Sequence, residues 1–217
     1  MKKLFFIITA AASISLCACH KSPATPLLEE HPVEDYMFTK ASAVFLSTYQ
    51  STNFYDYGYE FKSSRSGKII KLGCRMAALN SVNVVSVWDA DTHALILSKQ
   101  VTNTDQSNFI YVDLTVTNEA ISIPANKNYI VNVHPTVGLS QELAAGVYDV
   151  SRNDKNVIIP FTDQAITVTG LCAVLVPGLT SIPDKPTLAT FPSTSLPADY
   201  LKNIIGMPDI GFQANDF

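Results

Sequence analysis

Residues 108–116 read NFIYVDLTV, and this stretch decides the fold class because its side chains alternate between two rows. One row is aliphatic throughout, whereas the other mixes aromatic and polar side chains. Successive side chains of a β-strand point to opposite faces of a sheet. The stretch therefore predicts a strand that turns its aliphatic row to a core. The predicted core row is Ile110, Val112, Leu114 and Val116, and the outer row is Phe109, Tyr111, Asp113 and Thr115.

Two-faced strands of this kind recur along most of the chain, and no amphipathic helix of normal length is visible before residue 195. A strand packed on one face only is typical of antiparallel sheets, because parallel sheets are usually covered on both faces. The pattern predicts an all-β protein built as an antiparallel β-sandwich. The expected strands are residues 57–62, 68–77, 82–89, 94–101, 109–116, 120–123, 129–134, 146–150, 157–161 and 166–176.

Four motifs carry a resemblance to a known kind of module: GYEF at 58–61, GKIIKLGCRM at 67–76, VVSVWD at 84–89 and NYIV at 128–131. Together they resemble an uncharacterised bacterial β-sandwich module of secreted and cell-surface proteins, over residues 55–135. The resemblance implies a jelly-roll-like sandwich, and it implies a setting in which such modules often stand beside carbohydrate-binding or adhesive domains.

The N-terminus has the features of an export signal. Two lysines precede an apolar run, Leu4–Leu16, and small residues follow it before a cysteine. The run is shorter than the roughly 20 apolar residues that a membrane-spanning helix needs. The stretch LCAC at 16–19 resembles the bacterial lipobox, which implies that residues 1–18 are a lipoprotein signal peptide and that Cys19 receives the lipid. A plain secretory signal is the alternative.

Proline positions divide the mature chain into three parts. Residues 19–40 contain three prolines and are expected to form a lipidated tether, and residues 41–177 are expected to form the sandwich. Residues 178–217 are a Pro-rich C-terminal extension, expected to dock on the sandwich. Within it, we predict a short helix over 195–206, ended by Gly206, and an edge strand over 209–212.

The composition limits the classes of partner that the protein can bind. The net charge of −4, without a basic block, argues against nucleic acid as a partner. Contact with the membrane is therefore expected through the lipid at Cys19. No motif for a hydrolase nucleophile, a phosphate loop or a zinc site is present, so we expect neither an enzyme nor a cofactor.

Two sets of residues are candidates for binding. Tyr55, Tyr57, Phe109 and Tyr111 are aromatic residues of predicted strands, and rings on a rigid sheet can stack on sugars. Asp89 and Asp91 offer carboxylate oxygens to a cation such as Ca²⁺, although turn-forming aspartates that bond their own backbone have the same spacing.

These observations predict a lipid-anchored protein of the cell envelope, at the outer membrane, that binds a glycan or a protein partner without catalysis. The alternative is a structural or assembly subunit of a surface appendage or envelope complex. Alternation places both Cys74 and Cys172 in the core. Outside the cytoplasm the two thiols can either form a disulfide or remain free, and the sequence leaves both states open.

Overall fold

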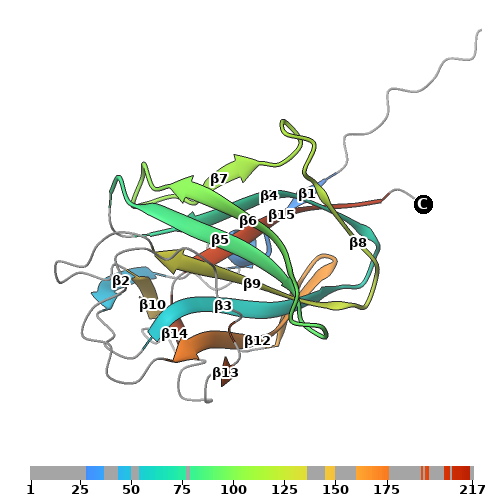
Figure 1. Cartoon of the computed structure of the whole chain (residues 1–217). Helices are drawn as coiled ribbons and strands as arrows, with labels where there is room; N and C mark the ends of the chain where they lie inside the picture. Colours follow the sequence, from blue (N-terminus) through green and yellow to red (C-terminus); the bar gives the residue numbers. More distant parts are fainter. Residues whose placement is uncertain are drawn as a thin grey trace, which may run out of the picture.

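The computed structural model describes residues 28–36, 44–49, 54–76, 79–135, 145–149, 160–175, 192, 194–195, 203–205 and 207–215. The chain is an all-β protein in which two antiparallel sheets pack together, as predicted (Figure 1). The Cys19 lipidation site, the signal peptide and most of the expected tether lie outside the described residues.

The larger sheet has seven strands. Its order is β11 (Phe161–Asp163), β12 (Ile166–Leu175), β3 (Phe54–Ser63), β9 (Asn128–Pro135), β5 (Val82–Asp89) and β6 (Leu95–Thr102), and β13 (Thr194–Ser195) pairs with β12. Strand β3 lies at the centre and pairs with β12 on one side and β9 on the other.

The smaller sheet has five strands. Its order is β1 (Glu29–Glu30), β15 (Met207–Ala214), β4 (Gly67–Arg75) and β7 (Ile110–Asp113), and β8 (Ile121–Ile123) pairs with another part of β4. The short helix α1 (Pro32–Asp35) follows β1 directly. A further three-stranded sheet has the order β14 (Asn203–Ile205), β10 (Ala145–Asp149) and β2 (Val44–Tyr49). Among the described residues, no helix is long and apolar enough to cross a membrane.

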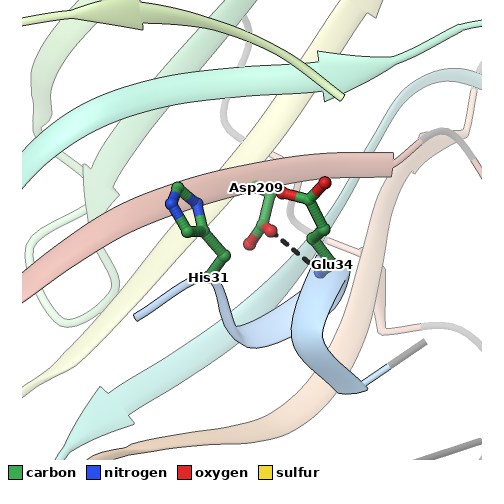
Figure 2. A group of neighbouring side chains, drawn as sticks. All are labelled: His31, Glu34 and Asp209. Atoms are coloured by element: carbon green, nitrogen blue, oxygen red, sulfur yellow. Dashed lines mark hydrogen bonds between the residues drawn. The ribbon is translucent and has the colours of Figure 1, made fainter. Parts of the chain in front are cut away.

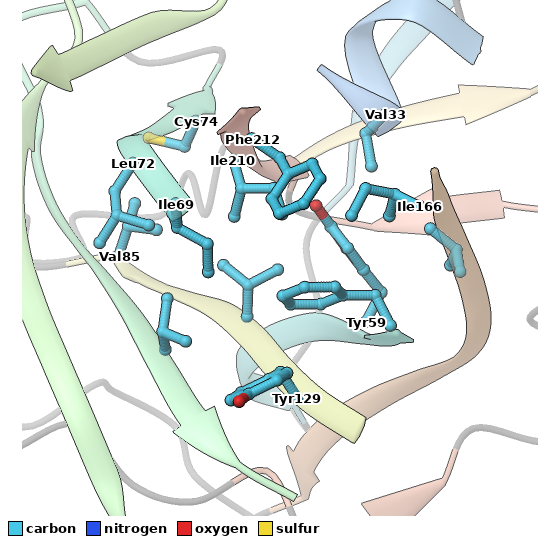
Figure 3. Close-up of a cluster of buried hydrophobic side chains, with 14 of the residues drawn as sticks. Val33, Tyr59, Ile69, Leu72, Cys74, Val85, Tyr129, Ile166, Ile210 and Phe212 are labelled. Atoms are coloured by element: carbon cyan, nitrogen blue, oxygen red, sulfur yellow. The ribbon is translucent and has the colours of Figure 1, made fainter. Parts of the chain in front are cut away.

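The core lies between the seven-stranded and five-stranded sheets, and Figure 3 shows part of it. Tyr59 and Phe61 of β3 contribute the large rings of one sheet, while Phe212 and Ile210 of β15 contribute the other side. Val33 of α1 is also part of this cluster. Residues from both ends of the described chain therefore close the same core.

Most predicted strands are confirmed, with end points that shift by a few residues. The segment 157–161 is an exception, because the described strand there is β11, which begins at Phe161; residues 157–159 lie outside the described part. Strand β2 was not predicted.

The predicted face assignment of residues 109–116 is wrong in part. Strand β7 ends at Asp113, and the chain then turns, so the alternation stops short of Val116. Leu114 is buried in the core but Val116 is 82% exposed. At the other end, Phe109 precedes the strand and is buried instead of facing outward.

The C-terminal predictions also need correction. Within the range 195–206, the described residues 203–205 form strand β14 instead of a helix. The predicted edge strand 209–212 is part of the longer β15, and it is not an edge, because it pairs with β4 on one side and β1 on the other. Ile210, Phe212 and Ala214 of β15 are buried in the core, so β15 is an integral strand of the five-stranded sheet and not a docked extension.

Part of the predicted tether is folded as well. Glu29 and Glu30 pair with Gln213 and Phe212 of β15, and α1 packs beside them. We call the residues Leu28–Tyr36 the N-terminal arm. Pro32 is compatible with this structure because it occupies the first turn of α1, where a missing N–H costs nothing.

Candidate functional site

Asp209 of β15 is a completely buried carboxylate at the point where the N-terminal arm meets the sandwich. Its Oδ1 accepts hydrogen bonds from the backbone N–H of Val33 (3.2 Å), from the hydroxyl of Tyr59 (3.2 Å) and from the backbone N–H of the adjacent Ile210 (2.9 Å). Its Oδ2 accepts the N–H of Glu34 (2.9 Å) and lies 2.9 Å from the hydroxyl of Tyr111. Buried charge needs this many partners, because an unpaired carboxylate is costly inside a protein.

Two of those donors belong to the first turn of α1. A helix normally satisfies these N–H groups with the side chain of its N-cap residue, but the N-cap residue here, His31, makes no such bond. Asp209 takes that role from 175 residues away. The Asp35 carboxylate completes the turn by accepting the N–H of His31 at 3.0 Å. The arm is therefore held to the C-terminal strand by a cap that comes from that strand.

His31, Glu34 and Asp209 point toward one another (Figure 2), and one ligand-type atom of each lies within 4.8 Å of the others. Tyr111 of β7 joins them, because its hydroxyl lies 2.9 Å from Glu34 Oε2 as well as 2.9 Å from Asp209 Oδ2. The imidazole Nε2 of His31 lies 2.8 Å from Glu29 Oε1. We call His31, Glu34, Tyr111 and Asp209 the arm cluster.

Burial dominates the electrostatics of this cluster. It raises the pKa of Asp209 to about 6, although the N–H donors and His31 act in the opposite direction. Burial also raises the pKa of Tyr59 and of Tyr111, and the Asp209 carboxylate adds to both effects. Both phenols therefore stay protonated and act as hydrogen-bond donors.

One imidazole and two carboxylates are a donor set that some divalent cations accept. In this cluster, however, the oxygens of Asp209 already accept three backbone N–H groups and the Tyr59 hydroxyl, and the Tyr111 hydroxyl lies between the two carboxylates. A carboxylate offers about four acceptor positions, so a cation would have to displace existing partners. The geometry is that of a hydrogen-bonded clamp.

Ion pairs hold the rest of the arm. Glu29 lies 2.8 Å from Lys71 of β4, and the buried Glu30 pairs with Arg65 at 3.1 Å. Glu30 also accepts the N–H of Ala165 at 2.9 Å, and burial raises the pKa of Glu30. The arm is thus attached to both main sheets.

A second buried polar network crosses the opposite face of the seven-stranded sheet. Trp88 donates from Nε1 to Asn132 Oδ1 at 2.7 Å, and Asn132 donates to Asp56 at 3.1 Å. Asp56 also pairs with His134 Nδ1, and all of these polar residues are buried. Gly58 allows β9 to approach closely, because a Cβ there would lie 2.1 Å from the carbonyl oxygen of Val131 and 2.8 Å from the Cβ of Asn132.

The predicted aromatic residues do not form one exposed surface. Phe109 is buried in the core, 6% exposed, and stacks beside Tyr111, whose hydroxyl belongs to the arm cluster. The side chains of Tyr55 and Tyr57 lie outside the described part, although both residues belong to β3.

Asp89 is used by its own turn. Its Oδ1 accepts the N–H groups of Asp91 and Thr92, each at 3.0 Å, and its Oδ2 lies 2.5 Å from Lys127. The hydrogen bond to Lys127 is the largest of the effects that lower the pKa of Asp89 to about 2. This arrangement is that of a turn-forming aspartate, while Asp91 itself is exposed.

Cys74 and Cys172 are free and buried. Cys74 lies in the core, where burial raises its pKa to about 12. Cys172 does not share that core, contrary to the prediction, and packs with Trp88 and Ile130 on the opposite face of the seven-stranded sheet. The register of β12 shifts between Val168 and Gly170, and one extra residue in a strand turns every later side chain to the other face.

Strand β6 is an exposed edge. It is the last strand of the seven-stranded sheet and pairs with β5 alone among the described strands. Leu95 and Ile96, at its beginning, are 43% and 39% exposed. Such an edge offers unpaired backbone groups next to apolar side chains.

Sequence reasoning missed the arm cluster because it assigned residues 19–40 to a tether. Pro32 followed by Glu34 and Asp35 is the one local signal of a helix start there, since proline favours the first turn and acidic residues favour the N-terminus. No local signal connects that turn with Asp209. Neither the protein-family models nor the curated proteins contain a match to this chain.

Proposed function

We propose that this protein is a lipid-anchored component of the cell envelope, at the outer membrane, and that its sandwich binds another envelope protein without catalysis. In this proposal the lipid at Cys19 holds the chain at the membrane. The edge strand β6 receives an extended segment of the partner, which adds a strand to the seven-stranded sheet.

The exposed edge of β6 is the observation that carries the proposal. Backbone groups on the free side of an edge strand can pair with another chain, and neighbouring apolar side chains add affinity. Leu95 and Ile96 supply those side chains. The arrangement favours a protein partner over a glycan, because Phe109 is buried and the hydroxyl of the half-buried Tyr111 is engaged by Asp209 and Glu34.

The test compares two edges of the same sheet. Full-length protein in detergent serves as bait for envelope extract, alongside the double variant Leu95→Lys, Ile96→Lys and a control, Thr162→Lys. Thr162 is exposed on β11, the strand at the far end of the sheet. Losing two apolar contacts is worth about 1–2 kcal/mol, so we expect about tenfold weaker capture by the β6 variant and unchanged capture by the control.

Two results would contradict the proposed binding mode. One is equal capture by all three proteins. The other is binding to a glycan array that the β6 variant retains in full. Ordered polymers of the purified chain that depend on β6 would instead identify the partner as a second copy, which is the structural-subunit alternative.

The anchor is tested separately. Cys19→Ala should move the protein from the detergent phase to the aqueous phase, because stable attachment needs the acyl chains of the modified cysteine. Cys17→Ala is the matched control and should leave partitioning unchanged. Membrane association that survives in Cys19→Ala would refute the lipid anchor.

A further inference from the structure

The Tyr111 hydroxyl has one proton but lies at hydrogen-bond distance from two carboxyl groups. The distances to Asp209 Oδ2 and Glu34 Oε2 are both 2.9 Å. A single proton makes one full hydrogen bond, and the lone pairs of the hydroxyl then repel the other carboxylate. Two full bonds require a second proton, carried by one carboxyl group and donated to the hydroxyl oxygen.

We propose that the three oxygens of Asp209, Tyr111 and Glu34 bind one additional proton, and that this proton tightens the docking of the N-terminal arm on β15. The row of oxygens joins three elements: Glu34 belongs to the arm, Asp209 to the C-terminal strand and Tyr111 to β7. Because Glu34 brings its carboxyl group to Tyr111 only when the arm is docked, binding of the additional proton is coupled directly to the arm.

Several other charged or titratable groups face this site from the surrounding elements. They are Glu29, Glu30, His31 and Asp35 of the arm, Tyr59 of β3, Lys71 and Arg75 of β4 and Asp163 of β11. Glu29 is paired with Lys71 and with His31, and Glu30 with Arg65. The buried Asp209 and the half-buried Tyr111 and Glu34 are therefore the part of the site that gains from a proton.

The direction of the pH effect follows from the approach of Glu34, which brings a second carboxyl group to the Tyr111 hydroxyl only when the arm docks. The pKa of Asp209 is about 6 when the arm is docked, against an ordinary value of 3.8. The docked state therefore binds the additional proton more tightly, and docking strengthens as the pH falls through about 6. The upper limit of this effect between pH 7.5 and pH 5 is an increase of about tenfold in the docking equilibrium, reached when release of the arm returns Asp209 to its ordinary pKa. The raised pKa of Glu30 acts in the same direction.

The arm is the part of the described chain nearest to the expected lipid anchor, so this inference extends the proposed function. Release of Leu28–Tyr36 would add an extended segment of nine residues, about 30 Å, between the anchor and the sandwich. Acidic conditions would hold the domain close to the membrane, and neutral conditions would let the arm release it more often.

Hydrogen exchange of the full-length protein in detergent measures the docking. The N–H groups of Val33 and Glu34 donate to Asp209, so their protection reports the docked state. After correction for the intrinsic pH dependence of exchange, we expect greater protection at pH 5 than at pH 7.5, by up to about tenfold. Fluorescence of Trp88, the only tryptophan in the chain, monitors overall folding in the same samples.

Three variants test which side chains cause the pH dependence of arm docking. Glu34→Gln replaces the proton with an amide N–H that donates permanently to Tyr111, so the arm should stay protected at both pH values. Tyr111→Phe removes the central oxygen and should lower protection at pH 5 and abolish the response. Asp113→Asn, on the same strand as Tyr111 but exposed, is the matched control and should respond like the original protein.

Three results would overturn the proposal: a full pH response in Glu34→Gln, loss of the response in His31→Gln, or protection that depends on added Zn²⁺ at constant pH. The last would identify the cluster as a metal site. None of these measurements depends on lipidation or on β6, so failure of the proposed function leaves this test intact.

Discussion

Replacing Phe212 with alanine tests whether the end of the chain is part of the core. The ring belongs to β15 and is completely buried between the two main sheets, against β4, where a Cβ on Gly67 would lie 2.4 Å from it. A buried Phe→Ala substitution costs about 3–5 kcal/mol from lost burial and the remaining cavity. A domain of this size has roughly 5–15 kcal/mol of net stability, so we expect a folded but clearly weakened protein.

Urea unfolding and thermal melting of the full chain, each followed by Trp88 fluorescence and circular dichroism, measure this loss. At about 2–4 °C per kcal/mol, the melting temperature should fall by roughly 10 °C. Val116→Ala is the control, because Val116 is apolar but 82% exposed and should change the free energy of unfolding by less than about 0.5 kcal/mol. If Phe212→Ala does not fold, Ile210→Val removes a single methyl group from the same strand and should cost about 1 kcal/mol.

A loss below about 1 kcal/mol in Phe212→Ala, equal to that of Val116→Ala, would refute the assignment. It would mean that β15 contributes little to the core and that the C-terminal residues are a docked extension after all.

Three further predictions concern the buried residues of the seven-stranded sheet and its neighbour. In a variant with Cys17 and Cys19 replaced by serine, thiol labelling under denaturing, non-reducing conditions should modify both Cys74 and Cys172. Labelling of the native protein should be slow, because both thiols are buried. Protection of both cysteines after denaturation would reveal a disulfide. Gly58→Ala should lower the free energy of unfolding in urea by more than about 2 kcal/mol, since the added methyl group meets the backbone of β9. Unchanged stability of this variant would show that β3 and β9 are not so close. Asn132→Ala should lower the free energy of unfolding by about 2–4 kcal/mol, because it removes the buried hydrogen bonds to Trp88 and Asp56. A red shift of Trp88 emission should accompany this loss of stability. An unchanged urea midpoint would count against the network.

Local alternation predicted the strands well wherever a strand runs straight. The residues Tyr129, Val131 and Val133 face the core as their spacing indicates, because successive side chains of an extended chain must point to opposite faces. The same rule failed at Leu171 and Cys172, where the register shift before Gly170 exchanges the two faces, and Leu171 takes the core position. A bulge depends on the partner strand, so the spacing within one strand does not reveal it.

The candidate site was beyond such reasoning for a related reason. Tyr111 looks like an outward-facing aromatic residue in its strand, and His31 looks like a residue of a tether. Their roles depend on Asp209, which lies about 100 and 180 residues further along the chain. Proximity of this kind arises only when the two sheets pack, because no local periodicity records which distant strand will lie beside a helix.

By itself, the sequence determined that this protein is an antiparallel β-sandwich, because the alternation of side chains is a local property of an extended chain. Tertiary structure alone decided that the last strand lies between β1 and β4, and that the carboxylate of Asp209 caps a helix near the other end. The physical reason is burial: a carboxylate acquires its partners and its raised pKa only when distant segments exclude water around it.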